Sequence, residues 1–432
     1  MPKRKTKKTK KSTQPPLHNV TIKRKKRNCP PMSTNRVLYP PIKPYRALHL
    51  EVDTLKSNVP SKIYVEVLGN PRGIPVIYLH GGPGDFITPF LRRIFNPKRF
   101  NVAIFDQRGT GKSTPKRQLE KNTTQHSIAD IEKIRKEVLK VDKVIIAGGS
   151  WGASLAVLYA QAHPDHTSAI LLRGFVDLGR RQHQSQNYFN ETYKELYPEI
   201  MEKFAHAINK TIKEHKLKLK YIKPTNEGKN VAATLFKMVT SKNPHIRKKA
   251  ANIWAMTADD IMYLNPEDHA AGHGDNEDQT LTLATIDLHY IINNYFLSPD
   301  QMIKQKNVNK IKHIPTYFIH GRYDTICPLR MAYSLHRRLE HPKNRLEIVK
   351  AGHTYYEPEI AKGCIDGLNY LGDIVQNKSR QSRKNKSKSK SKSKSKSKGK
   401  SKSKSRSRSK SKSKSKSKSK SKSKSKSESK SK

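Results

Sequence analysis

A serine set among glycines, between a predicted strand and a predicted helix, constrains this chain more than any other feature. The pentapeptide is Gly148-Gly149-Ser150-Trp151-Gly152. The preceding residues 144–147 are apolar and mostly β-branched, which predicts a buried strand, and the Ala- and Leu-rich residues 153–160 predict a helix. Small residues allow a sharp turn between the two elements, which would hold the Ser150 hydroxyl at the start of a helix whose dipole favours negative charge. Such a turn presents serine as a nucleophile; the alternative is a glycine-rich turn with an incidental serine.

Further apolar runs indicate the sheet to which this turn belongs. Continuous runs, typical of strands buried on both faces, occupy residues 75–79, 101–105, 144–147, 169–172, 316–319 and 346–349. Alternating runs at 48–52 and 63–67 predict an antiparallel hairpin at the start. Because strands alternate with helical segments, we expect an α/β fold whose mostly parallel sheet is covered by helices on both faces.

One internal segment and both ends depart from this pattern. Residues 176–305 contain helical, polar segments and no buried strand, so we interpret them as a helical cap inserted over the carboxyl edge of the sheet, where ligands of α/β proteins bind. The predicted organisation is a basic arm, a core in two parts separated by the cap, and a Lys/Ser-rich tail, at residues 1–40, 41–175, 176–305, 306–376 and 377–432.

The two ends carry most of the charge. The formal net charge is +53, with 12 Lys/Arg and no acid in residues 1–28, and 27 Lys/Arg and one acid in residues 378–432. The tail has almost no apolar residue to bury, so we expect it to be disordered. Its charge predicts binding to nucleic acid or another polyanion without sequence preference. The alternative is a tail that only improves solubility.

The cysteines and the lack of long apolar runs indicate the compartment in which the protein works. The three cysteines, Cys29, Cys327 and Cys364, are far apart and show no metal-ligand spacing, so we expect a reducing compartment and no disulfide framework. No apolar run is long enough for a membrane span, and the basic N-terminus lacks the apolar stretch of a secretory signal. We therefore expect an intracellular protein; a nucleus, a nucleic-acid-rich compartment or a virion would suit the basic ends. The sequence does not determine the oligomeric state.

Two further residues complete a catalytic constellation with Ser150. Asp324 follows the predicted strand at 316–319, and His353 follows the strand at 346–349. Their order along the chain is that of the α/β-hydrolases, and all three residues lie at carboxyl ends of strands. We expect Ser150 to be the nucleophile, His353 the general base and Asp324 the acid that orients the histidine.

A glycine-rich loop after the strand at 75–79 is placed to bind an oxyanion. It reads His80-Gly81-Gly82-Pro83-Gly84. The backbone N–H groups of Gly81 and Gly82, with that of Trp151, are predicted to form the oxyanion hole. A phosphate-binding loop is disfavoured, because no Gly-Lys-Ser/Thr ends the loop and Pro83 lacks a donor.

The motifs together resemble those of proline iminopeptidases, which are serine peptidases of the α/β-hydrolase fold. The similarity covers residues 40–372 and rests on the segments at 80–84, 106–109, 148–152, 321–324 and 351–353. It implies hydrolysis of an N-terminal proline from small peptides without a metal or organic cofactor. In the family, the Asp-Gln-Arg-Gly turn, here at 106–109, mainly braces the oxyanion loop.

The chain departs from the family on the cap, where glutamates bind the free amine of the substrate. Thr257-Ala258 stands where the family has Trp-Glu, and aligning residues 291–296 with the family segment Ile-Glu-Asn-His-Tyr-Phe puts Ile292 in place of the second glutamate. Both carboxylates are therefore expected to be lost. Asp259 or Asp260 can substitute from one or two residues along, but we favour the alternative that both are N-terminal residues of the next helix. Trp254 and Tyr295 are the other residues expected to contact substrate.

These features favour a serine hydrolase that cleaves a small peptide, amide or ester. The complete triad and oxyanion loop support this reading. The alternative is a basic nucleic-acid-associated or structural protein with a vestigial hydrolase domain, which the missing glutamates and the long tail support. The sequence does not identify the physiological substrate.

Overall fold

The computed structural model describes residues 37–179, 191–223, 228–264 and 276–378, together with Gln381. Most of the predicted basic arm and of the Lys/Ser-rich tail lies outside these residues, so both remain predictions. Within the described ranges, the search for a helix that is both long enough and apolar enough to span a membrane finds none.

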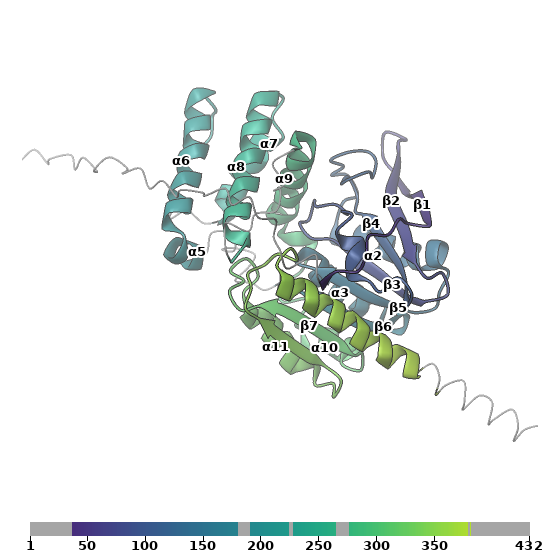
Figure 1. Ribbon diagram of the computed structural model, residues 1–432. Coiled ribbons are helices and arrows are strands. Elements are labelled where there is room, and N and C mark those ends of the chain that lie inside the picture. The colour runs from purple at the N-terminus through teal and green to yellow at the C-terminus, as the bar shows by residue number, and fades with distance from the viewer. Residues whose placement is uncertain (1–36, 180–190, 224–227, 265–275, 379–380, 382–432) are drawn as a thin grey trace, which may run out of the picture.

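One eight-stranded sheet forms the centre of the molecule (Figure 1). Its strands are β1 (Arg46–Thr54), β2 (Pro60–Gly69), β3 (Ile74–Leu79), β4 (Phe100–Asp106), β5 (Val144–Gly149), β6 (Thr167–Arg173), β7 (Thr316–Gly321) and β8 (Arg345–Val349). The spatial order is β1-β2-β4-β3-β5-β6-β7-β8; β1, β2 and β4 pair antiparallel, and all other pairs are parallel. The predicted hairpin and the mostly parallel sheet are confirmed, and so is the burial of the runs in β3 to β7. The run at 346–349 also forms a strand, but the prediction that it is buried on both faces is wrong, because β8 lies at the edge of the sheet and is only half-buried.

Helices cover both faces of this sheet. Successive side chains of a strand point to opposite faces, so apolar residues on both faces need to be buried. In β3, Ile77 and Leu79 point into one hydrophobic cluster, and Val76 and Tyr78 into another. The first cluster includes side chains from α2 (Thr124–Lys133), its π-helical continuation Ile134–Leu139, α3 (Trp151–Ala162), α10 (Gln305–Ile311) and α11 (Leu329–Leu339). The second includes the short 3₁₀ helix η1 (Leu91–Ile94) and the C-terminal helix at 358–378.

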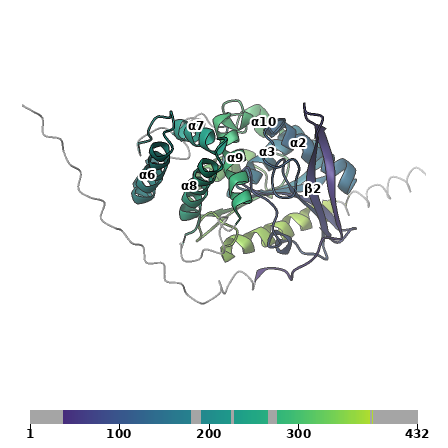
Figure 2. The same ribbon diagram turned by 90° about the horizontal axis from the view of Figure 1, so that it is seen from above.

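In the described residues, five α-helices follow β6 and precede α10, after which the chain returns to the sheet at β7. They are α5 (Glu191–Leu196), α6 (Pro198–Glu214), α7 (Gly228–Val239), α8 (Pro244–Met262) and α9 (Glu277–Ile292). Seen from above, α6 to α9 stand together beside the sheet (Figure 2). They bury a cluster of their own that includes Phe204, Leu235, Trp254 and Leu288. The cap therefore has its own core, separate from the two that cover the sheet.

Candidate active site

Ser150 occupies a strained turn between β5 and α3. Its φ of 57° and ψ of −124° lie in a region that non-glycine residues rarely adopt. The two flanking glycines have no room for a side chain: a Cβ on Gly148 would lie 2.1 Å from the carbonyl oxygen of Gly152, and one on Gly152 would lie 2.1 Å from that of Leu79. The close approach of strand, helix and neighbouring strand therefore requires glycine on both sides of the serine.

His353 and Asp324 form a buried pair at the same edge of the sheet. Asp324 follows β7 and His353 follows β8, and Nδ1 of His353 lies 2.8 Å from Oδ2 of Asp324. The other carboxylate oxygen of Asp324 accepts a hydrogen bond of 2.7 Å from the backbone N–H of Cys327. Burial opposes ionisation of Asp324, but His353 and these hydrogen bonds outweigh it and lower the pKa of the carboxyl. An ionised Asp324 holds His353 with its proton on Nδ1 and leaves Nε2 as the base.

Ser150 and His353 line one cavity without touching through a hydrogen bond in the described structure. Nε2 of His353 instead lies 3.4 Å from Nη1 of Arg173. Contacts between a nucleophile and its base commonly shorten only when substrate binds. The structure thus brings the three predicted catalytic residues to one site and pairs two of them directly.

The glycine-rich loop after β3 forms the wall of the cavity beside Ser150. Gly81 and Gly82 both line the cavity, and a Cβ on Gly81 would lie 3.4 Å from Cβ of Ser150. Trp151, the third predicted oxyanion residue, is the first residue of α3 and is buried. Backbone N–H groups from the loop and from the helix start are thus available on the two sides of the nucleophile.

A hydrogen-bonded turn ties this loop to α3 from behind. The backbone N–H of Gln107 donates to Nε2 of His80 at 3.0 Å, and the indole N–H of Trp151 donates to Oε1 of Gln107 at 2.8 Å. Arg108 makes two hydrogen bonds of 2.7 Å to Asp130. Asp106 accepts from two backbone N–H groups, 2.8 Å from Ile87 and 2.7 Å from Lys112. None of these three turn residues, and none of their hydrogen-bond partners, lines the cavity; they hold its wall in place.

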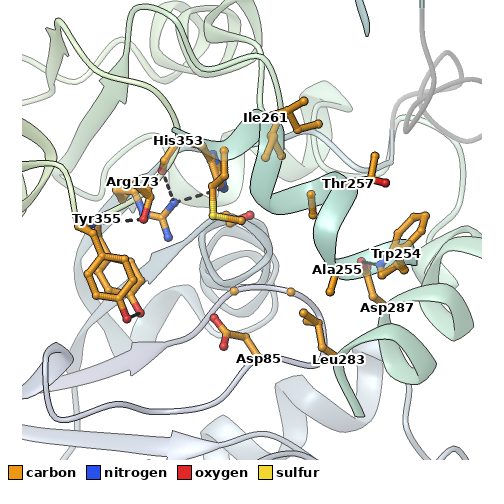
Figure 3. Close-up of a pocket in the computed structure, with 18 residues that line it drawn as sticks. Asp85, Arg173, Trp254, Ala255, Thr257, Ile261, Leu283, Asp287, His353 and Tyr355 are labelled. Carbon is orange, nitrogen blue, oxygen red and sulfur yellow. Dashed lines mark hydrogen bonds between the residues drawn. The ribbon is translucent and has the colours of Figure 1, made fainter. Parts of the chain in front are cut away.

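The cap closes the opposite side of the cavity with α8 and α9 (Figure 3). Their contribution is mostly apolar or small, and its members are Trp254, Ala255, Thr257, Ala258, Ile261, Met262, Leu283 and Asp287. The indole N–H of Trp254 donates to Oδ2 of Asp287 at 3.0 Å, and both side chains are buried. A carboxylate with a fixed orientation therefore lies on the cap side of the same cavity as Ser150.

Three of the four residues expected to contact substrate have described side chains, and one of these three lines the cavity. That residue is Trp254. Tyr295 instead stacks on Trp151, with ring centroids 6.0 Å apart. Asp260 lines a separate cavity, between α6 and α8, together with Lys210 and Glu214. Asp259 lies on α8, but its side chain falls outside the described part of the structure. The structure thus does not bring Asp260 to the nucleophile.

Asp287 corrects the expectation that both cap carboxylates are lost. Ile292 packs against the hydrophobic cluster of the cap. Asp287 is the second residue of Ile286-Asp287-Leu288-His289-Tyr290-Ile291, which matches the family segment Ile-Glu-Asn-His-Tyr-Phe five residues earlier than the sequence comparison placed it. In this register an aspartate replaces the glutamate. The loss of the first glutamate stands, because Thr257 and Ala258 both line the cavity.

Sequence reasoning missed four other residues of the cavity, Asp85, Arg173, Tyr355 and Tyr356. Each adjoins a motif that was recognised. Asp85 directly follows the glycine-rich loop, Arg173 is the last residue of β6, and the two tyrosines follow His353 and Thr354. The rule that strand ends supply functional residues would have found Arg173.

One group of side chains in the described residues offers several metal-ligand atoms close together. Asp324, Cys327 and His353 bring such atoms within 4.8 Å of one another. Nδ1 of His353 and Oδ2 of Asp324 are already hydrogen-bonded to each other. Burial, the largest influence, raises the pKa of the Cys327 thiol well above its usual value. A protonated thiol is a poor metal ligand, so this chemistry fits the histidine–aspartate pair better than a metal centre.

Comparisons with known proteins identify relatives of this chain. A family profile described as the alpha/beta hydrolase fold matches residues 74–359. The chain is 35% identical over 335 residues to a probable proline iminopeptidase of Leptolyngbya boryana, covering 77% of this chain and 96% of the relative. It is 36% identical to the proline iminopeptidase of Arabidopsis thaliana, covering 76% of this chain and 80% of the relative. An esterase from Exiguobacterium antarcticum is similar in structure, with a TM-score of 0.47 and 19% identity over 75% of this chain and 99% of the esterase.

Proposed function

Because this chain belongs to the proline iminopeptidase family of the α/β-hydrolase fold, we propose that it removes an N-terminal residue, proline above all, from short peptides. The family makes it a serine hydrolase, and a peptide substrate follows from the same homology. Ser150 is proposed as the nucleophile, His353 as the base and Asp324 as the residue that orients the base. The vestigial alternative receives no support from the site, since the strained serine and the histidine–aspartate pair are both present.

The proposed reaction proceeds through an acyl-enzyme. The hydroxyl of Ser150 attacks the carbonyl carbon of the first residue while Nε2 of His353 takes its proton. Negative charge then develops on the carbonyl oxygen, and the N–H groups of the glycine-rich loop and of Trp151 stabilise it. His353 returns the proton to the departing amine, and water releases the N-terminal residue by the same steps. Throughout, Asp324 keeps the imidazole in the required tautomer.

The buried carboxylate of Asp287 is the observation that supports a substrate with a free N-terminus. Its side chain is only 4% exposed, is held by Trp254 and lines the cavity that contains Ser150. A protonated amine loses its hydration when it enters such a cavity, so it must find a compensating negative charge there. An ester without an amine needs no such partner. We therefore expect Asp287 to act on substrate selection and not on the chemistry at Ser150.

The test compares proline p-nitroanilide with its N-acetyl derivative and with p-nitrophenyl acetate. We expect wild-type protein to favour the free amine over the acetylated form by about 100-fold in kcat/KM, because blocking the amine removes its charge. Asp287→Asn is expected to lower kcat/KM for the free prolyl substrate by about tenfold to 100-fold, with ester hydrolysis within about threefold of wild type.

Asp260→Asn is the matched control, because Asp260 is on the same cap but lines a different cavity. It is expected to change neither activity. Equal cleavage of the free and acetylated prolyl substrates would overturn the proposed function. If Asp287→Asn and Asp260→Asn had equal effects, Asp287 would have no specific role in binding the amine.

A further inference from the structure

Arg173 is a buried cation whose presence the triad itself does not explain. It ends β6, is only 4% exposed and lines the cavity beside Ser150. No carboxylate of the described residues lies within ion-pair distance of its guanidinium, and its Nε makes no hydrogen bond there. Burying a charge without a paired opposite charge is costly. A buried arginine of this kind points to electrostatic work at the site it lines.

The guanidinium of Arg173 contacts His353. Nη1 donates to the backbone carbonyl of His353 at 2.9 Å and lies 3.4 Å from Nε2 of the same residue. On the other side, Cζ lies 5.6 Å from the centre of the Tyr355 ring. Figure 3 shows Arg173 between Tyr355 and His353. The positive charge is thus held against the nitrogen that must accept the proton of Ser150.

Gly149, inside the nucleophile turn, makes this position available. A Cβ on Gly149 would lie 2.2 Å from Nη2 of Arg173 and 2.6 Å from both Cζ and Nε. Its three nearest neighbours are all atoms of this one side chain, and no backbone atom is among them. The glycine therefore accommodates the guanidinium, in contrast to Gly148 and Gly152, which accommodate backbone.

We propose that Arg173 is a positioning residue that acts through His353 and serves two stages of the reaction. Before the reaction, its hydrogen bond to the backbone carbonyl of His353 and its position beside Nε2 hold the imidazole in place to act as a base. When the substrate carbonyl becomes an oxyanion and His353 becomes a cation, the site gains one negative and one positive charge. Arg173 then balances the charge of the oxyanion, while Asp324 balances that of the imidazolium. The proposal rests on the triad of the proposed function.

The test is the pH profile of ester hydrolysis, and its interpretation must include every charged or titratable group around His353. The titratable and charged groups around it are Asp324, His320 and Cys327 from β7 and the loop after it, Arg173 from β6, Ser150 from the turn before α3, and Tyr355 from the segment after β8. In that last segment, Glu357 accepts a hydrogen bond from the backbone N–H of Gly352, next to His353. Of these, Arg173 is the one permanent cation. Because this charge lies 3.4 Å from Nε2 of His353, we expect its removal to move the acid limb of kcat/KM to higher pH.

Arg173→Met and Arg173→Lys separate charge from packing, with p-nitrophenyl acetate as substrate. We expect Arg173→Met to move the acid limb upward by about one pH unit and to lower kcat on the plateau by about tenfold to 100-fold with little change in KM. Arg173→Lys keeps a positive charge and should leave the limb near its wild-type position. A purely structural role predicts loss of rate in both variants with an unmoved limb, and that result would overturn the proposal.

Gly149→Ala provides a second test that keeps the arginine in the chain. The added methyl group pushes the guanidinium away from His353, so the acid limb should move in the same direction as in Arg173→Met. The double variant Gly149→Ala/Arg173→Met has no guanidinium to displace. Its acid limb should therefore coincide with that of Arg173→Met alone. An unmoved limb in Gly149→Ala, or additive shifts in the double variant, would contradict the proposal. Because the ester carries no amine, failure here leaves the prolyl specificity to be judged by its own experiment.

Discussion

The two walls of the Ser150 cavity are built by different means. The sheet wall consists of strand ends and tight turns, where the Ser150 turn and the loop at Gly81 and Gly82 are fixed by backbone that passes within van der Waals distance. The cap wall consists of two helix faces, on which one buried pair, Trp254 and Asp287, is surrounded by small or apolar side chains. The first wall permits little change at any position, whereas the second can change one side chain at a time.

Packing separates the two walls as well. The sheet is covered by two hydrophobic clusters, while the cap helices mostly bury a third of their own. Cap helices are also linked at their surface, by Lys248 with Glu277 and Lys249 with Glu214. Such exposed ion pairs contribute little to stability. Substitutions on the cap wall should therefore change substrate choice without disturbing the chemistry at Ser150. Substitutions on the sheet wall should disturb that chemistry without changing substrate choice.

The largest effect is expected on the sheet wall, at Asp324. Asp324→Asn should lower kcat by about 10⁴-fold, because the amide no longer holds the histidine in the productive tautomer. Asp106→Asn is the comparison, since Asp106 is also buried but binds two backbone N–H groups outside the cavity. We expect that variant to lose about 1–3 kcal/mol of stability through an unsatisfied donor and to retain most of its rate. A greater rate loss in Asp106→Asn, at unchanged thermal stability, would reverse the assignment of the acid.

A smaller effect is expected on the cap wall, at Ala258. Ala258→Glu adds a second carboxylate to the cavity that holds Asp287, at the position where the family has glutamate. We expect KM for proline p-nitroanilide to fall by about fivefold to tenfold, with ester hydrolysis nearly unchanged. Met256→Glu, on the same helix but 64% exposed and facing the other cavity, should leave both unchanged. If KM rises in Ala258→Glu, or if the two variants behave alike, the cap wall does not select for the amine.

The same difference between the walls explains what the sequence could predict. Around Ser150, the close approach of backbone permits only glycine at positions 148 and 152, so these two residues predict the turn. Runs of apolar residues predict the strands in the same way, because a buried strand requires them. The triad order then follows from the strand ends. The fold, the mixed sheet and the grouping of Ser150, Asp324 and His353 were accordingly predictable without coordinates.

On the cap wall, residue type depends on which face of a helix meets the cavity. Two similar segments, at 286–291 and 291–296, compete for one family motif, and both contain a Tyr at the same place in the motif. Only the packing shows that Asp287 faces the cavity while Ile292 faces the cap core. Arg173 was missed for a related reason. Its place at a strand end can be read from the sequence, but its burial without a carboxylate partner is a property of the assembled site.

The most direct test of the account is whether Ser150 is an activated nucleophile. A fluorophosphonate reacts covalently with a serine whose proton is taken by a neighbouring base. Incubation of full-length protein, followed by peptide mass spectrometry, should place a single modification on Ser150. Ser150→Ala should remain unmodified and inactive towards every ester and prolyl substrate while keeping its fold by circular dichroism. A wild-type protein that stays unlabelled, or that is labelled elsewhere while Ser150→Ala remains active, would contradict the account.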